Sequence, residues 1–380
     1  MRILVNVDTF APLGGVELST LQVCRELAAR GHEIDVLYKD SGGLRDQWES
    51  FARHLEQVRG FTVPAARPWQ ATVLPRSVRA GVRTAPDIVY LNRSEQLLWG
   101  AATSAFAGAP LVCHLRHHPF SAPAVRVLKN AARRYIAVSE FIRSEWIEAG
   151  ISPDRIEVIH NGVDPSAYPC AILADRWRLR AALGIAPEAR VFLHYGRLTS
   201  DKGAAALLGA WGRAQVPEHW RLVLAGDADP DISAMIGDLR RSDVIVLPRR
   251  EQVTELLAIA DVTVLPALWH EPFGRVVIES MAAGVPVIAS ERGGIPEILA
   301  GPWARFLVDP DEVGSLEAAI LRFGDWRAGE PDLGESCRSH VRDEFSLSKT
   351  VDGIESVLRF AEGSPPGVSR LRLEDREQIK

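Results

Sequence analysis

Two glutamates, Glu271 and Glu279, stand eight positions apart in a stretch that reads ADVTVLPALWHEPFGRVVIESMAAGVPVIASERGGIPEIL. The apolar run at 262–265 predicts a strand. A short helix carrying Glu279 should end at Gly284, because a glycine often follows the last helical turn. Glu271 then lies in the intervening loop and Glu279 two turns along. Both carboxylates can therefore face one cleft at the carboxyl ends of parallel strands, where open α/β sheets bind ligands.

Arg197 and Lys202 form a second candidate pair, five positions apart. They follow an apolar run at 191–195 that predicts a strand, and they precede an apolar helix that extends through Trp211. At such a loop, the planar fork of an arginine and the point charge of a lysine can clamp a diphosphate from two sides. The alternative is a pair of solvated surface charges.

The elements that must position these side chains alternate between strand and helix along the chain. At 380 residues the chain is long enough for two domains. The alternation predicts an α/β fold with two Rossmann-like domains that face one cleft. Turn signals at 160–165 place the boundary between a front domain, 1–165, and a back domain, 166–345. The composition of 363–380 predicts a disordered tail.

The front domain opens with a strand at 3–7, the glycines Gly14 and Gly15, a helix at 16–30 and a strand at 34–38. This order makes a βαβ unit. The two glycines allow the backbone to come close to an anion or a sugar at the helix N-terminus, although a tight turn alone would also use them. The G-x-G-x-x-G fingerprint is absent, which argues against a nicotinamide-dependent oxidoreductase.

A polar cluster follows the strand predicted at 110–115, and it consists of His114, Arg116, His117 and His118. The histidine spacing alone could suggest a metal site. No clustered carboxylate or thiolate completes a ligand set, so the spacing does not support a metal site.

Three D-x-D pairs could also suggest a divalent metal, and they are Asp227 with Asp229, Asp229 with Asp231, and Asp309 with Asp311. Proline inside two of these pairs marks turns rather than a preformed cage. Because the Arg197 and Lys202 pair can meet the charge of a diphosphate, we expect no metal in this site.

The stretch around the two glutamates resembles the signature of the retaining GT-B glycosyltransferases of family 4, also called group 1. The resemblance rests on Glu271-Pro-Phe-Gly with Glu279, on Ala282–Val287, on Gly293-Gly294-x-x-Glu297 and on the G-R-L-x-x-x-K-G match at 196–203. It implies that a hexose-type sugar passes from a nucleoside-diphosphate sugar, UDP or GDP, to an acceptor hydroxyl with retained configuration. The acceptor would be a glycan, a lipid-linked molecule or a small molecule, and a helix at 346–362 would cross back onto the front domain.

The resemblance also implies roles for individual residues. Glu279 would bind the ribose hydroxyls and Glu271 a hydroxyl of the donor sugar, while a helix N-terminus near Gly294 would favour the leaving diphosphate. The catalytic candidates are Glu271, His114 and His117, and the donor-binding candidates are Arg197, Lys202, Glu279, Gly274, Phe273, Gly293, Gly294, Gly14, Gly15 and Arg249. Arg275 departs from the family, which usually has an aliphatic residue there. It could reach a phosphate or an acidic acceptor, or point to solvent.

The composition of the chain argues against several classes of binding partner. Basic and acidic residues nearly balance, 44 against 49, which argues against a nucleic-acid binder. The four cysteines show no metal-type spacing, and no apolar run reaches the roughly 18 residues that span a bilayer. We therefore expect a cytoplasmic enzyme without a cofactor. The resemblance implies that the front domain takes the acceptor, with contacts in 41–86, and the alternative for this segment is a solvated basic face. Weak membrane contact through 41–86 or 126–134 and a non-catalytic nucleotide-sugar-binding protein stay as alternatives, and the oligomeric state stays open.

Overall fold

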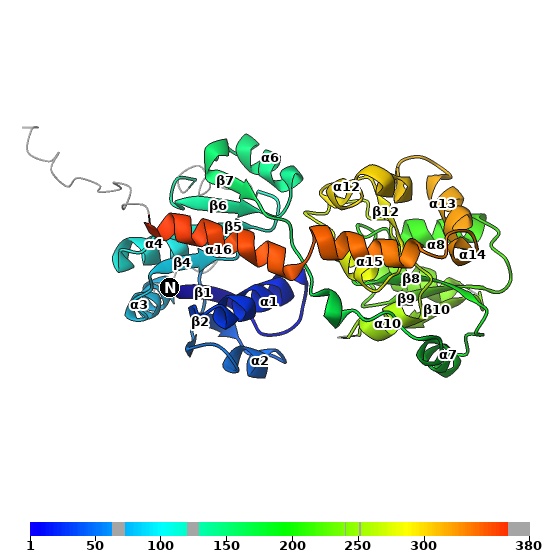
Figure 1. Ribbon diagram of the computed structural model, residues 1–380, viewed down its shortest axis with the longest axis horizontal. Helices are drawn as coiled ribbons and strands as arrows, with labels where there is room; N and C mark the ends of the chain where they lie inside the picture. The colour runs from blue at the N-terminus through cyan, green and yellow to red at the C-terminus, as the bar shows by residue number, and fades with distance from the viewer. Residues whose placement is uncertain (63–72, 120–128, 240, 251, 364–380) are drawn as a thin grey trace, which may run out of the picture.

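The computed structural model describes residues 1–62, 73–119, 129–239, 241–250 and 252–363. These residues form two lobes, each built on a parallel sheet that helices cover on both faces (Figure 1). The predicted α/β fold with two Rossmann-like domains is confirmed. The tail from residue 364 and parts of the predicted acceptor and membrane segments, 63–72 and 126–128, lie outside the described residues.

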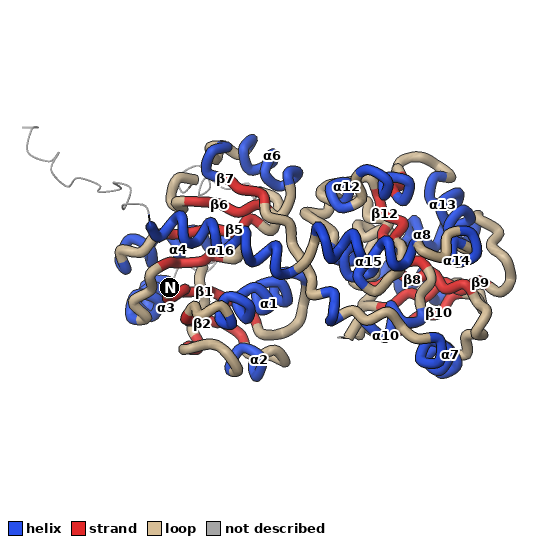
Figure 2. The backbone as a smooth tube through the Cα atoms, viewed as in Figure 1, coloured by secondary structure: helices blue, strands red, loops and turns tan. Residues whose placement is uncertain are grey.

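The sheet of the first lobe has the order β3-β2-β1-β4-β5-β6-β7, and its strand pairs are parallel. Figure 2 shows its strands between the helices of the lobe. Its strands are β1 (Arg2–Thr9), β2 (Glu33–Asp40), β3 (His54–Gln57), β4 (Ile88–Leu91), β5 (Leu111–Leu115), β6 (Arg134–Ala137) and β7 (Ile156–Val158). Continuous apolar runs such as Ile3–Val5 are fully buried, as strands covered on both faces require.

Helices place an apolar layer on each face of this sheet. They are α1 (Gly15–Ala29), α2 (Arg45–Glu49), α3 (Val73–Arg83), α4 (Leu97–Ala107) and α6 (Glu140–Glu148). Side chains of α1, such as Leu21 and Leu27, pack in one layer, while Trp99 of α4 and Trp146 of α6 pack in the other.

The sheet of the second lobe has the order β10-β9-β8-β11-β12-β13. Its strands are β8 (Arg190–Tyr195), β9 (Trp220–Ala225), β10 (Val244–Leu247), β11 (Val262–Leu265), β12 (Val287–Ser290) and β13 (Leu307–Val308). Its helices are α7 (Leu173–Ala182), α8 (Ala204–Arg213), α9 (Pro230–Asp238), α10 (Thr254–Ile259), α11 (Arg275–Ala282), α12 (Ile295–Ile298), α13 (Ser315–Phe323), α14 (Trp326–Gly329) and α15 (Leu333–Glu344).

The chain passes between the lobes twice, and the two crossings are hydrogen-bonded to each other. The amide of Val163 donates to the carbonyl of Phe345 at 3.0 Å, and the amide of Leu347 donates to the carbonyl of Val163 at 2.8 Å. The last helix, α16 (Leu347–Gly363), then lies along the first lobe (Figure 1). Its apolar face packs in the same layer as α1, and Glu355 pairs with Arg30 at 3.0 Å.

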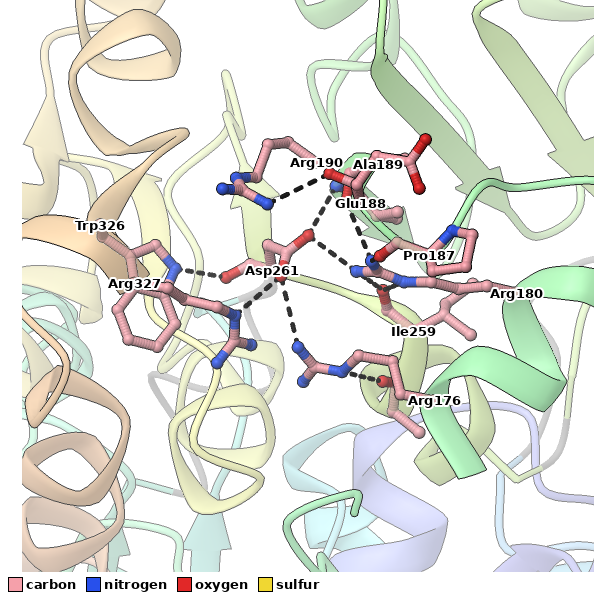
Figure 3. Close-up of polar contacts among 12 residues, drawn as sticks. Arg176, Arg180, Pro187, Glu188, Ala189, Arg190, Ile259, Asp261, Trp326 and Arg327 are labelled. Carbon is pink, nitrogen blue, oxygen red and sulfur yellow. Dashed lines mark hydrogen bonds and ion pairs between the residues drawn. The ribbon is translucent and has the colours of Figure 1, made fainter. Parts of the chain in front are cut away.

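A buried carboxylate at the amino end of β11 holds the second lobe together (Figure 3). Asp261 accepts from Arg180 at 2.7 Å, from Arg327 at 2.8 Å and from the amide of Val191 at 2.9 Å, and it also pairs with Arg176. Burial alone would raise the pKa of Asp261, but the charges of Arg180 and Arg327 outweigh it and hold the pKa below its usual value. One side chain thus ties α7, β8 and α14 to β11.

Replacing this carboxylate by an amide should unfold the second lobe more easily. We expect Asp261→Asn to lower the free energy of unfolding by about 3–5 kcal/mol, because it leaves buried arginines without a counter-charge. Urea denaturation measures the change, and Asp325→Asn, which removes the exposed partner of Arg190, should cost less than about 1 kcal/mol. Since the folded pKa of Asp261 is depressed, its contribution is present above the unfolded pKa and is lost as the pH falls. Equal effects of both substitutions would contradict this role.

Candidate active site

The loops that follow β5 and β11 meet between the lobes. The ring of His118 approaches the carbonyl of His270 at 2.8 Å and lies 5.4 Å from the ring of Trp269. Phe141 stacks on His270 with ring centroids 5.6 Å apart. Carboxyl ends of parallel strands from both sheets therefore border one cleft, as ligand sites of α/β sheets require.

Glu271 and Lys202 form a close ion pair in this cleft. Lys202 Nζ lies 2.6 Å from Glu271 Oε1, and the two side chains are 16% and 13% exposed. The ammonium also lies 4.3 Å from the centre of the Trp269 ring, a favourable cation–π contact. The structure thus brings a predicted phosphate ligand of the β8 loop directly to a predicted sugar ligand of the β11 loop.

Gly293 and Gly294 hold the backbone of Glu271 rather than offering a free helix end. Gly293 has a φ of 63°, and a side chain there would overlap the carbonyl of Glu271. The amide of Gly294 donates to that same carbonyl at 2.8 Å. Helix α12, which follows, spans only four residues. The amide of Gly294 is thus already hydrogen-bonded. The helix whose N-terminus was expected to favour the leaving diphosphate is also short.

Glu279 lies on α11 with both carboxylate oxygens in contact with the protein. Its Oε1 accepts from Arg275 Nε at 3.0 Å, and its Oε2 accepts from the hydroxyl of Tyr195 at 3.2 Å. Tyr195 ends β8 and directly precedes the loop of Arg197 and Lys202. The carboxylate therefore stands beside the predicted diphosphate loop.

The other predicted donor residues divide into exposed and buried ones. The side chain of Arg197 is 64% exposed and, among the described residues, pairs only with Asp201, at 3.7 Å, so it does not form a clamp with Lys202 in this structure. Arg249 reaches across to the carbonyl of Pro12 in the first lobe. Phe273 is buried and stacks on His160, with ring centroids 5.6 Å apart.

Three of the predicted glycines have structural roles, in the backbone conformation or in close packing. Gly274 takes a φ of 109°, which favours glycine, just before α11. Gly14 precedes α1 in extended conformation, and Gly15 begins this helix against the side chain of Arg275.

The two candidate histidines have different surroundings. His114 is buried within β5, its Nδ1 lies 2.7 Å from the Tyr90 hydroxyl, and burial lowers its pKa well below the usual value. His117 keeps exposed surface, and burial followed by the charges of Arg93 and Arg116 lowers its pKa. Of the two, His117 is therefore the neutral imidazole that a substrate can reach.

Sequence reasoning gave no role to Arg93, although the structure places it beside His117. Arg93 pairs with Asp8 at 3.2 Å and also with Glu17. Asp8 lies near the end of β1, Glu17 in the first turn of α1, and Arg93 in the loop after β4. Arg93 stands in no motif, so no sequence signal could have found it.

The aspartates of the D-x-D pairs are engaged in local structure. Asp229 caps α9 by accepting from the amide of Ile232 at 2.9 Å. Asp309 accepts from the amide of Asp311 at 2.9 Å, and Asp311 pairs with Arg292. No group of three or more His, Cys, Asp or Glu side chains suited to a metal occurs within the described ranges.

Glu297 connects the two lobes through a contact that its motif did not reveal. Its carboxylate accepts from the amides of Glu140 and Phe141, at 2.8 and 2.9 Å, and from the ring of His160 at 2.9 Å. A residue of the second lobe thus caps α6 of the first, where a negative charge is favourable. Burial raises the pKa of Glu297, but the bonds from His160 and from the two amides outweigh it and hold the pKa below its usual value.

The fold and this cleft define a class of protein, the GT-B glycosyltransferases, and comparison with known proteins agrees. Two family models match adjacent stretches: Glycosyltransferase Family 4 at residues 13–167 and Glycosyl transferases group 1 at residues 175–331. Together they cover most of the chain. The chain therefore belongs to the glycosyltransferases that these two models describe.

Two relatives match this chain over most of its length. The chain is 23% identical to N-acetyl-alpha-D-glucosaminyl L-malate synthase of Bacillus anthracis, covering 94% of this chain and 97% of that protein. It is 24% identical to the UDP-Gal:alpha-D-GlcNAc-diphosphoundecaprenol alpha-1,3-galactosyltransferase of Escherichia coli, covering 93% and 96%. Among solved structures, Anabaena Alr3699/HepE in complex with UDP-glucose superposes with a TM-score of 0.81 at 26% identity, covering 95% of this chain and 100% of that one.

Removing the charge of Glu297 should loosen α6 from the second lobe. We expect Glu297→Gln to lower the free energy of unfolding by about 1–2 kcal/mol and to speed amide exchange at the start of α6. Glu140→Gln is a matched control, because its exposed side chain pairs only locally with Arg143 while its amide stays bound to Glu297. Since the folded pKa of Glu297 is depressed, the difference should vanish as the pH falls and the glutamate becomes protonated. Unchanged exchange at α6 would refute the cap.

Proposed function

We propose that the protein transfers a hexose-type sugar from a nucleoside-diphosphate sugar to an acceptor hydroxyl, with retained anomeric configuration. The observation that carries the proposal is the pair of Lys202 and Glu271 between the loops that follow β8 and β11, with Glu279 bonded to Tyr195 at the end of β8. The complex of Anabaena Alr3699/HepE with UDP-glucose supports a UDP-sugar as the first donor to test, with a GDP-sugar second.

The charges of the cleft suit departure of a diphosphate. Lys202 is already in place, and the exposed Arg197 is free to turn toward the same phosphates. Positive charge aimed at the oxygen that takes the electrons of the breaking C1–O bond stabilises the transition state more than the ground state. Glu279 would bind the ribose hydroxyls, and Glu271 a hydroxyl of the donor sugar.

The pairing of Lys202 with Glu271 gives the donor a defined place. A diphosphate must share Lys202 with this carboxylate, so its arrival redistributes the hydrogen bonds of both side chains. Glu271 then offers acceptor positions to a sugar hydroxyl next to the phosphate that Lys202 binds. Phosphate and sugar are thus recognised side by side.

On the acceptor side, we propose that His117 contacts the acceptor hydroxyl, with a glycan, a lipid-linked molecule or a small molecule as substrate. Its lowered pKa keeps the imidazole neutral near pH 7 and able to accept a hydrogen bond. His114 is less suited, because its ring is enclosed within β5.

We also propose a cytoplasmic enzyme with weak contact to an anionic membrane surface. The exposed arginines of α3, Arg76, Arg79 and Arg83, lie next to the uncharged helix α4, whose Phe106 is 77% exposed. In the described part of the chain, no helix is both long and apolar enough to cross a bilayer. Sedimentation with phosphatidylglycerol vesicles should exceed that with phosphatidylcholine vesicles, and Arg76→Gln with Arg79→Gln should abolish the difference.

A donor screen tests the function. Released nucleoside diphosphate, scored over UDP-, GDP-, ADP- and dTDP-sugars, should identify one base that supports slow donor hydrolysis by the purified protein. With that donor, Glu271→Ala should lower turnover by a factor on the order of 10² or more, while the variant stays folded. A non-catalytic nucleotide-sugar-binding protein would instead bind a donor without releasing diphosphate. Wild-type turnover in the folded variant would remove Glu271 from the mechanism.

Catalysis should need no divalent metal, because Lys202 and Arg197 can meet the charge of the diphosphate. We expect turnover to survive dialysis against EDTA. Asp229→Asn should leave both turnover and stability nearly unchanged, since asparagine caps a helix about as well as aspartate. Loss of turnover on chelation, with recovery in magnesium or manganese, would show that the metal-free mechanism is wrong.

A further inference from the structure

Arg275 reaches from the second lobe into the first. It is the first residue of α11, and its side chain is only 11% exposed. Its Nη1 donates to Ser19 Oγ at 2.6 Å and its Nη2 to Gln22 Oε1 at 3.4 Å, both on α1. The third nitrogen, Nε, donates to Glu279 within its own helix. One guanidinium thus bonds to both lobes at once.

Helix α1 is shaped to receive this side chain. A Cβ atom at Gly15 would lie 2.8 Å from Cδ of Arg275, so the stem of the arginine occupies the space that a larger residue would fill. Ser19 and Gln22 are three positions apart and therefore lie on the same side of α1. The first turns of α1 offer a slot at Gly15 and two polar groups along one side of the helix.

The contact with Glu279 leaves that carboxylate able to bind a ligand. Arg275 occupies a lone pair of Oε1 and Tyr195 one of Oε2, while an ionised carboxylate has about four acceptor positions. Both members of the Arg275–Glu279 pair are nearly buried, so the orientation of the carboxylate depends on the guanidinium. Arg275 therefore orients the Glu279 carboxylate and leaves acceptor positions on it open to a ligand.

We propose that Arg275 is a positioning residue that couples donor binding in the second lobe to closure against the first. The inference rests on the proposed role of Glu279 as the ribose ligand. Opening the lobes would take Ser19 and Gln22 away from a guanidinium that Glu279 holds in place. A donor that fixes Glu279 through its ribose also fixes Arg275, and this favours the closed arrangement because the bonds to α1 exist only there.

Separate substitutions can test the two ends of this contact. Arg275→Leu removes the contacts with both Glu279 and α1. Ser19→Ala with Gln22→Ala removes only the contact with α1, and Arg275→Lys keeps the positive charge of the side chain. Arg213→Leu is a matched control, because this exposed arginine pairs with Glu317 on the second lobe. UDP affinity, the radius of gyration at saturating UDP, kcat and KM are measured for each protein, with Tm as the check on folding.

The expected pattern separates positioning from packing. Arg275→Leu should weaken UDP binding about 10-fold, enlarge the radius of gyration with UDP and lower kcat about 10-fold or more. The Ser19 and Gln22 double variant should keep UDP affinity within about 2-fold of wild type but share the larger radius and the lower kcat. Arg275→Lys should recover part of the UDP affinity, since an ammonium can still pair with Glu279.

Two outcomes would overturn the inference while the proposed function stands. One is Arg275→Leu with wild-type UDP affinity, radius of gyration and kcat, and the other is a double variant with wild-type radius and kcat. If the wild-type protein bound no nucleoside diphosphate at all, the proposed function would fail, and donor coupling with it. A loss of UDP affinity in Arg213→Leu equal to that in Arg275→Leu would also refute a specific role.

Discussion

The backbone of residues 271–273 is fixed from two sides, and the candidate site depends on this constraint. From within the second lobe, Gly293 packs against Glu271 and the amide of Gly294 bonds to its carbonyl. From the first lobe, Ser139 Oγ donates to the carbonyl of Pro272 at 2.6 Å. A loop held in this way presents the Glu271 carboxylate to Lys202 in one orientation, and the same loop supplies part of the contact between the lobes.

The two ends of strand β11 use similar chemistry for different purposes. At its amino end, Asp261 is buried and fully surrounded by donors, so it only stabilises the fold. At its carboxyl end, the pair of Lys202 and Glu271 is partly exposed and can exchange partners with a ligand. Burial therefore decides which ion pair is structural and which can bind.

Local patterns predicted much of the fold, because strands such as 262–265 and helices such as that of 16–30 carry their own apolar signal. Strand β3, with the sequence HLEQ, lies at the sheet edge and carries no such signal. The motifs also predicted Glu271 and Lys202. They could not predict the partner of Arg275, because Ser19 lies 256 positions away and only the packing of the lobes joins them.

The return of α16 to the first lobe sets an order for folding during synthesis. Val351, Ile354 and Leu358 belong to the same buried layer as Ile3 and Leu27. The first lobe therefore lacks part of its core until the ribosome has made nearly the whole chain, whereas domains usually fold as they emerge. The second lobe, although synthesised later, can complete its own sheet first. A chain that lacks α16 leaves the apolar side chains that this helix covers, Ile3 and Leu27 among them, without part of their packing partners.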